Sequence, residues 1–301
     1  MSEYRMFDGS QYQLLDFGQG RKLERFGSLV LDRVSPAADG DLPADPASWQ
    51  KSHFRFQRQQ GEQGQWVANQ QLPVAAGSSK EDGLPAPWLI QHNQLALELS
   101  LTPAGHLGLF PEQAINWDWL TRQLAAKGKE PLKVLNLFAY TGGSTLTAAA
   151  AGAEVVHVDA ARNTVAWARR NARHCGLQDA PIRWICEDCL KFVRRELSRG
   201  NQYDAVIMDP PSYGHGPEGQ NWKIERDLGP LLDACAELTS NGRRFMLLTC
   251  HSPSYGPADL HALLTDHVFG SCQQGGDASV LTIDCVDGRR LPTGVVARWP
   301  G

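Results

Sequence analysis

From residue 131 onward, short apolar runs alternate with amphipathic segments of helical length, and this alternation limits the possible folds more than any other feature. Five of these runs are expected to form strands: KVLNLF (133–138), EVVHVD (154–159), PIRWIC (181–186), YDAVIMD (203–209) and RRFMLLTC (243–250). Continuous apolar strands separated by helices predict a mostly parallel sheet that is covered by helices on both faces.

Two further apolar runs near the end of the chain, SVLTIDC (279–285) and GVVARW (294–299), flank a turn around Gly288. This spacing predicts an antiparallel hairpin at one edge of the sheet. The helices are expected to reach Ala151, to run from about Arg162 to Cys175, to pass through Val193 and Leu197, and to cross 227–238. The predicted fold is therefore α/β, with a mostly parallel sheet of seven strands that ends in an antiparallel hairpin.

The first hundred residues have a different character, with many Gln, Gly, Pro and Trp residues and only short apolar runs. The stretch LALELSLT (95–102) alternates apolar and polar residues, which is typical of a half-buried strand, whereas 36–49 is expected to be a loop. We therefore predict a β-rich accessory module over residues 1–104 and the α/β domain over residues 105–301.

Composition excludes several classes of protein. No apolar stretch approaches the length of a membrane span, and the first ten residues lack the apolar core of an export signal, so a cytoplasmic location is expected. The seven cysteines are expected to be reduced thiols, and the Cys186–Cys189 spacing has no second pair to complete a metal site. With a net charge of −4, the chain as a whole has no basic field that would indicate nucleic-acid binding. The sequence does not indicate the oligomeric state.

In an open α/β sheet, ligands bind beyond the carboxyl ends of the strands, at the point where the strand order reverses. After the first predicted strand, small residues follow Phe138 and allow a ligand to approach the backbone; they are Ala139, Thr141, Gly142 and Gly143. The alternative is an ordinary turn between a strand and a helix. The segment lacks the GxGxxG spacing, which disfavours a nicotinamide or flavin cofactor.

Acidic residues follow the next two strands. Asp159 lies about twenty residues beyond the glycines, where a carboxylate can accept hydrogen bonds from ribose hydroxyls. Asp188 follows the third strand and can accept a hydrogen bond from an adenine amine. Either residue can instead cap the helix that follows it. A glycine-rich turn and two acids on three successive strand ends favour a cofactor that contains adenosine.

The fourth strand ends in Asp209-Pro210-Pro211-Ser212-Tyr213. Because proline fixes φ and excludes helix, the chain must leave the sheet as a stiff loop with Asp209 at its mouth, although a merely structural turn is the alternative. The loop resembles the Asp/Asn-Pro-Pro-aromatic loop of methyltransferases that act on nucleobases and amides. That resemblance implies that the loop holds a planar acceptor and that the aromatic ring stacks on it.

The form with a residue inserted before the aromatic, here Ser212, is similar to that of the 23S ribosomal RNA methyltransferases that modify cytosine C5 or guanine N7. The segment GHLGLFPEQAINW (105–117) resembles the glycine-rich hairpin that precedes their catalytic domain, with Glu112 and Ala114 departing from the usual acid and arginine. Residues 12–27 resemble the start of a bacterial subgroup of such enzymes, one without an obvious PUA domain.

The resemblance implies a class I methyltransferase fold with S-adenosylmethionine as its cofactor and ribosomal RNA as its partner. It implies cofactor contacts from the strand-end residues named above, and it adds Gln113 from the hairpin-like segment. The sulfonium is expected over the loops of the first and fourth strands, which also brings Asp209 to the cofactor. Asp209, Pro210, Pro211 and Tyr213 are the expected acceptor-holding residues.

Cys250 ends the fifth strand, near the expected position of the transferred methyl group. Methylation of cytosine C5 requires a thiolate that first adds to C6, and His251 can lower the pKa of the thiol or act as a base. The cytosine-C5 enzymes, however, keep their nucleophile at the position of Ser252. The alternative is that Cys250 is a buried packing residue. We therefore favour a base nitrogen or another acceptor over cytosine C5.

Basic and aromatic residues also interleave in the N-terminal half, at 21–25 and 53–58. They can contact RNA, or they can form a solvated face over a small core. The predicted function is methylation of a base of ribosomal RNA. Its rivals are a methyltransferase acting on a small molecule or a protein amide, and a module that binds the cofactor without catalysis; the stiff acceptor loop argues against the second.

Overall fold

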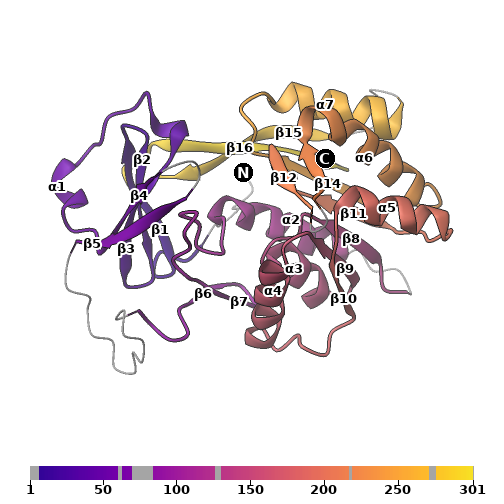
Figure 1. Cartoon of the computed structure of the whole chain (residues 1–301), viewed down its shortest axis with the longest axis horizontal. Helices are drawn as coiled ribbons and strands as arrows, with labels where there is room; N and C mark the ends of the chain where they lie inside the picture. Colours follow the sequence, from indigo (N-terminus) through magenta and orange to yellow (C-terminus); the bar gives the residue numbers. More distant parts are fainter. Residues whose placement is uncertain are drawn as a thin grey trace. The chain divides into compact units, whose positions relative to one another are not determined.

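A computed structural model of the chain describes residues 7–59, 63–69, 84–125, 130–216, 219–270 and 276–300. The chain divides into two compact units (Figure 1). Unit 1 contains Met1–Ile115 and Thr282–Thr293, and unit 2 contains Asn116–Leu281 and Gly294–Gly301. The boundary expected after residue 104 stays a prediction.

Unit 2 is built on the predicted sheet, whose strand order is β10-β9-β8-β11-β14-β16-β15. Its strands are β8 (Lys133–Leu137), β9 (Glu154–Asp159), β10 (Ile182–Cys186), β11 (Ala205–Met208), β14 (Phe245–Cys250), β15 (Asp277–Asp284) and β16 (Arg290–Trp299). β8 pairs in parallel with both β9 and β11, and β14 pairs antiparallel with β16. The predicted α/β fold and its terminal hairpin are confirmed, and the strand order reverses between β8 and β11.

Helices cover this sheet on both faces. They are α2 (Ala114–Ala125), α3 (Gly143–Ala150), α4 (Arg162–His174), α5 (Cys189–Ser198), α6 (Ile224–Leu238) and α7 (Pro257–Leu264), the last continuing as a π-helical turn over Thr265–Phe269. Residues of α5, α6 and α7 share one core with the sheet, including Phe192, Leu231 and Leu260. Helices α3 and α4 lie on the other face (Figure 1). None of the described helices has the length and apolarity that crossing a bilayer requires.

The helix after β9 illustrates why these segments fold as they do. In α4, Val165, Ala168 and Ala172 are buried at helical spacing and form the stripe that packs on the sheet. The helix ends where Gly176 adopts a φ of 69°, a left-handed conformation that glycine tolerates without a steric penalty. The same combination of an apolar stripe and a glycine stop is what made this helix predictable.

Unit 1 contains the predicted β-rich module. A five-stranded sheet has the order β1-β2-β3-β4-β5, antiparallel except for the parallel pair β3–β4, and a separate hairpin joins β6 to β7. The strands are β1 (Tyr12–Gly18), β2 (Arg21–Phe26), β3 (Leu29–Val34), β4 (Phe54–Arg58), β5 (Gly64–Ala68), β6 (Leu89–His92) and β7 (Leu95–Glu98). The expected loop at 36–49 contains two short helical turns, η1 (Pro36–Ala38) and α1 (Pro46–Trp49), each begun by a proline.

The basic side chains of β2 and β3 form ion pairs or hydrogen bonds within this sheet. Arg21 pairs with the buried Asp32 at 2.6 Å, and Arg33 pairs with the buried Glu24 at 2.6 Å. Burial by itself raises the pKa of Glu24, but the charges of Arg33 and Lys22 hold it below the ordinary value. These contacts favour a structural role for the basic residues at 21–25 over a role in RNA binding.

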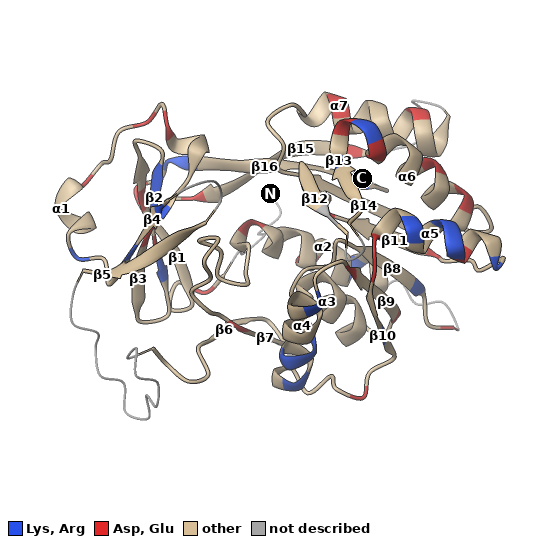
Figure 2. Cartoon of the chain, in the orientation of Figure 1, with Lys and Arg blue, Asp and Glu red and all other residues tan. Residues whose placement is uncertain are grey.

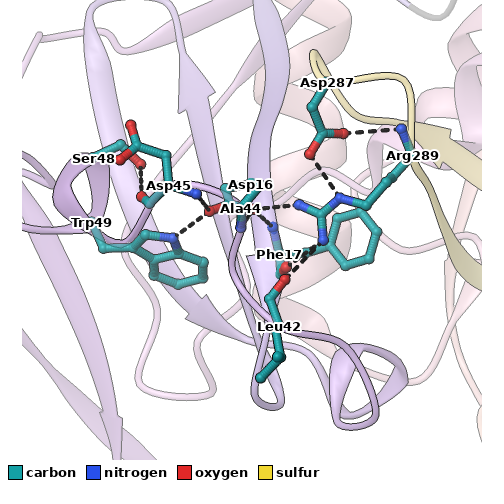
Figure 3. Close-up of polar contacts among 9 residues, drawn as sticks. All are labelled: Asp16, Phe17, Leu42, Ala44, Asp45, Ser48, Trp49, Asp287 and Arg289. Atoms are coloured by element: carbon teal, nitrogen blue, oxygen red, sulfur yellow. Dashed lines mark hydrogen bonds and ion pairs between the residues drawn. The ribbon is translucent and has the colours of Figure 1, made fainter.

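A buried carboxylate ties the hairpin tip to the rest of unit 1 (Figure 3). Asp16 accepts hydrogen bonds from the backbone N–H groups of Ala44 and Asp45 and from the Trp49 indole at 2.8–3.0 Å, and it pairs with the guanidinium of Arg289. Burial raises the pKa of Asp16, but these donors outweigh burial and lower it below the ordinary value. The guanidinium also lies 4.2 Å from the centre of the Phe17 ring. Residues 1–115 and 282–293 therefore share one set of contacts.

Replacing Arg289 by Met removes the ion pair and the donors to the carbonyl oxygens of Phe17 and Leu42. Because the partner carboxylate is buried, we expect the free energy of unfolding to fall by about 3 kcal/mol, measured by urea denaturation. The neighbouring Arg290 pairs with Asp284 in solvent, with side chains 72% and 66% exposed, so Arg290→Met should cost about 0.5 kcal/mol or less. Equal effects of the two variants would contradict the importance of the buried pair.

Candidate active site

The loop that joins β8 to α3 has an unusual backbone. Phe138 and Tyr140 adopt φ values of 53° and 50°, in the left-handed region that residues other than glycine seldom occupy. Two side chains support this conformation: the Tyr140 N–H donates to Asp159 Oδ2 at 2.9 Å, and the Phe138 N–H donates to Cys189 Sγ at 3.3 Å. Backbone held away from its preferred region by surrounding contacts is a recurrent property of functional loops.

The two glycines of this loop have a packing role. A Cβ on Gly142 would lie 3.2 Å from the Cβ of Ala168 in α4, and one on Gly143 would lie 2.3 Å from Cζ2 of Trp117 in α2. Gly142 also has a φ of 91°. Close helix packing therefore accounts for both residues, and their predicted contact with a cofactor, like that of Ala139 and Thr141, stays a prediction.

Asp159 ends β9 beside this loop. Its Oδ2 accepts the Tyr140 N–H, and its Oδ1 accepts the Ala161 N–H at 2.9 Å. Burial raises the pKa of Asp159, and these two backbone donors oppose the increase. Each carboxylate oxygen has more than one acceptor position. Asp159 can therefore brace the loop and still receive hydrogen bonds from a ligand.

Asp188 is the N-cap residue of α5, and its Oδ1 accepts the N–H of Lys191 at 2.8 Å, so the capping alternative is realised. The residue before it, Glu187, forms a two-pronged pair with Arg195 at 2.6 Å. The residue after it, Cys189, is buried, and burial raises its pKa well above the ordinary value, so the sulfur that supports Phe138 is a neutral thiol.

The Asp209-Pro-Pro loop continues into a short hairpin formed by β12 (Tyr213–His215) and β13 (Asn221–Lys223). Trp222, in β13, is buried, and its indole N–H donates to the carbonyl oxygen of Pro211 at 2.6 Å. The ring of Trp222 lies 4.8 Å from the ring of Phe138, centre to centre. One side chain thus connects the loop after β11 to the loop after β8. Tyr213 is 67% exposed.

The end of β14 contributes His251, whose Nε2 lies 3.3 Å from Asp209 Oδ1, with each side chain about one-third exposed (33% and 31%). The His251 ring fills the space beside Gly294: a Cβ at position 294 would lie 2.7 Å from His251 Nδ1. Cys250 is fully buried in the core, and its pKa is raised by burial and by the charges of Asp209 and Glu225, against a backbone hydrogen bond at Ser252. The thiol of Cys250 is therefore neutral.

The structure brings most of the predicted residues to one edge of the sheet: Phe138, Asp159, Asp188, Asp209 and Cys250 all lie at carboxyl ends of β8–β11 and β14 or directly after them. The buried Gln113 belongs to η2 (Pro111–Gln113) in unit 1, and its predicted role stays a prediction. The expected hairpin at 105–117 contains no strand. A tight loop overlaps its beginning and is closed by the Ser100 N–H, which donates to the Leu107 carbonyl oxygen at 3.0 Å.

Trp222 is the residue that sequence reasoning missed. The available signal was the glycine-rich stretch between Tyr213 and Trp222, which is typical of a hairpin between two aromatic residues. Among the described residues, no group of three or more His, Cys, Asp and Glu side chains has the arrangement of a metal site. A cavity of about 660 Å³ opens at the amino ends of β8, β9 and β10, lined in part by Lys133, Glu154 and Arg183, at the edge opposite the candidate site.

Comparison with known proteins agrees with this geometry. A family model described as S-adenosylmethionine-dependent methyltransferase matches residues 63–266. The crystal structure of the SAM-dependent methyltransferase from Agrobacterium tumefaciens is 34% identical, with a TM-score of 0.86 over 100% of this chain and 92% of that one. A putative SAM-dependent methyltransferase from Streptococcus mutans has a TM-score of 0.70 at 18% identity, over 97% and 76% of the two chains, which is a likeness of fold.

Curated relatives match over shorter segments. The ribosomal RNA large subunit methyltransferase K/L of Shewanella baltica is 32% identical over 145 residues, which are 48% of this chain and 19% of that protein. The ribosomal RNA large subunit methyltransferase I of Aeromonas hydrophila is 40% identical over 93 residues, which are 31% and 23% of the two proteins. The chain thus spans about a fifth of the length of these relatives.

The role of Trp222 can be separated from its packing. Trp222→Phe keeps a ring against Phe138 but removes the N–H that binds the Pro211 carbonyl oxygen. We expect kcat for methyl transfer to fall about tenfold or more because the acceptor loop loses its fixed position, with cofactor affinity unchanged. Trp167→Phe on α4 is the matched control. A kcat equal to that of the wild type would show that the Pro211 contact is dispensable.

Asp159→Asn leaves one acceptor oxygen in place of two. If the carboxylate receives the ribose hydroxyls, the dissociation constant of S-adenosylmethionine should rise about 10- to 100-fold, measured by calorimetry. Asp188→Asn retains a good helix cap and an acceptor oxygen, so we expect it to change the affinity by about threefold or less. An unchanged affinity in Asp159→Asn would remove Asp159 from the cofactor site.

Proposed function

Since the chain belongs to the family of S-adenosylmethionine-dependent methyltransferases, we propose that the acceptor of its methyl group is a base of ribosomal RNA. The observation that carries this proposal is the Asp209-Pro-Pro loop, which Trp222 joins to the loop after β8 and beside which His251 lies 3.3 Å from Asp209. A stiff loop of this kind suits a flat, rigid acceptor such as a nucleobase. The partial similarity to two ribosomal RNA methyltransferases supports the same acceptor class.

The residues at the strand ends fit the cofactor. The loops after β8 and β11 flank the point where the strand order reverses, the usual ligand site of such sheets. Asp159 would accept hydrogen bonds from the ribose hydroxyls, Asp188 would accept one from the adenine amine, and the backbone of 138–143 would face the rest of the molecule. S-adenosylmethionine supplies a methyl group activated on a positively charged sulfur.

The acceptor side depends on Asp209. Its carboxylate would receive a hydrogen bond from the acceptor, and the His251 imidazole lies 3.3 Å from Asp209 Oδ1. Tyr213 presents an exposed ring that can stack on a base. Because methyl transfer is a direct displacement, the main contribution of these residues is to hold the acceptor atom in line with the methyl group.

We further propose that the methylated atom is a base nitrogen and not cytosine C5. Addition of sulfur to cytosine C6 needs an accessible thiolate. The Cys250 side chain is fully buried and its pKa is raised by burial and by neighbouring carboxylates, both of which oppose thiolate formation. His251, which can in principle deprotonate a thiol, is directed to Asp209.

The direct test of the acceptor is methyl transfer to ribosomal RNA from a strain that lacks the gene, followed by mass mapping of the modified nucleotide. We expect one base in this RNA to accept the methyl group, and RNA from the parent strain to accept none. Transfer only to a protein or a small molecule would overturn the proposed acceptor while leaving the methyltransferase assignment intact.

The position of methylation has a separate test. Incubation with the cofactor and RNA containing 5-fluorocytidine traps enzymes that attack cytosine C6 as covalent adducts on a denaturing gel. We expect no adduct, and we expect Cys250→Ala to retain methyl transfer within about threefold, because the residue only packs in the core. An adduct that disappears in Cys250→Ala would make Cys250 the nucleophile and cytosine C5 the target.

A further inference from the structure

The helix α4 carries several basic positions and no acidic ones (Figure 2). Arg162, Arg169 and Arg173 are exposed, and they are separated by seven and four residues. At 100° per residue these positions fall on one line along the helix, about 10 and 6 Å apart. The side chain between them on this line is the small, exposed Ala166, so a partner can approach the helix closely.

The arginines of this row differ in their pairing from the paired arginines of α5. The sequence of α4 contains no Asp or Glu, although the whole chain has a net charge of −4. Within the described residues, no carboxylate lies at ion-pair distance from Arg162, Arg169 or Arg173. On α5, by contrast, Arg195 pairs with Glu187 at 2.6 Å and Arg199 with Glu196 at 3.5 Å. The charge of the α4 row is therefore available to a partner.

The row is connected to the candidate active site through the buried face of the same helix. α4 begins three residues after Asp159, and its inward face supports the loop after β8. Ala168 packs against Gly142, and Asn171 Nδ2 donates to the carbonyl oxygen of Thr141 at 2.9 Å. A polymer lying along the exposed face of α4 would therefore be separated from this loop by the width of one helix.

We propose that the exposed arginine row of α4 binds the phosphate backbone of the RNA substrate, while the Asp209 loop receives the base. The proposal rests on ribosomal RNA being the acceptor. Three arginines along a helix supply point charges and forked donors that match phosphate oxygens. A lipid surface fits less well, because the exposed large apolar side chains of the described residues are Leu42, Tyr213, Val280 and Val286, none of them on α4.

The test uses a fluorescein-labelled single-stranded RNA oligonucleotide and anisotropy titrations over a range of salt concentrations. Replacing Arg162, Arg169 and Arg173 together by Gln removes three phosphate contacts. At about 0.7 per contact, the slope of log affinity against log salt should become shallower by about 2, and affinity at 0.1 M salt should fall about 100-fold. The variant should bind S-adenosylmethionine as the wild type does, which excludes a general loss of folding.

A control with the same change in net charge replaces Lys191 and Arg194 on α5, together with Arg244, by Gln. In the control, the slope of log affinity against log salt should equal that of the wild type, because α5 packs on the face of the sheet opposite to α4. Wild-type affinity in the α4 variant would overturn the arginine row and leave base methylation standing. No RNA binding by the wild type would overturn both. Binding to phosphatidylserine vesicles but not to RNA would assign the row to a membrane surface.

Discussion

Strand β8 lies between β9 and β11, where its backbone is hydrogen-bonded on both sides and four of its five side chains are buried. A strand in this position has no free edge and no exposed face, so the chain can present polar groups only where it leaves the sheet. The backbone groups of the loop after β8 are therefore available to contact a ligand. The neighbouring strands end at the same edge, and for that reason Asp159 and Asp209 come close to this loop although they are fifty residues apart in the sequence.

Three contacts give the loop after β8 a single shape. Asp159 binds the Tyr140 N–H, Cys189 binds the Phe138 N–H, and the ring of Trp222 packs on the ring of Phe138. The first two come from the side of the sheet proposed to hold adenosine, and the third comes from the acceptor side. A substitution on either side would therefore shift the backbone of residues 138–140. Such coupling suits a reaction that depends on the alignment of cofactor and acceptor.

The features that the sequence predicted are those with a local signal. The five parallel strands are continuous apolar runs, and Asp209 is marked by two following prolines. Contacts between distant segments had no such signal. In the sequence, Gly143 is interpreted as a residue that lets a ligand approach the backbone. In the structure the space beside it is filled by Trp117, twenty-six residues earlier in the chain. The capping of α5 by Asp188 was foreseen only as an alternative, because a capping carboxylate and a ligand-binding one look alike in the sequence.

The hairpin formed by β15 and β16 belongs to both units, since its tip, Thr282–Thr293, is counted with residues from the first third of the chain. Asp16 is made before the strands and helices of the α/β domain, whereas Arg289 is made after all of them except β16. Until then the carboxylate has no guanidinium partner, so the N-terminal sheet cannot complete its contacts while the α/β domain is still being made. A single genetic crossover that exchanged only the N-terminal module would also separate Asp16 from Arg289. The two parts of the chain are therefore expected to be inherited together.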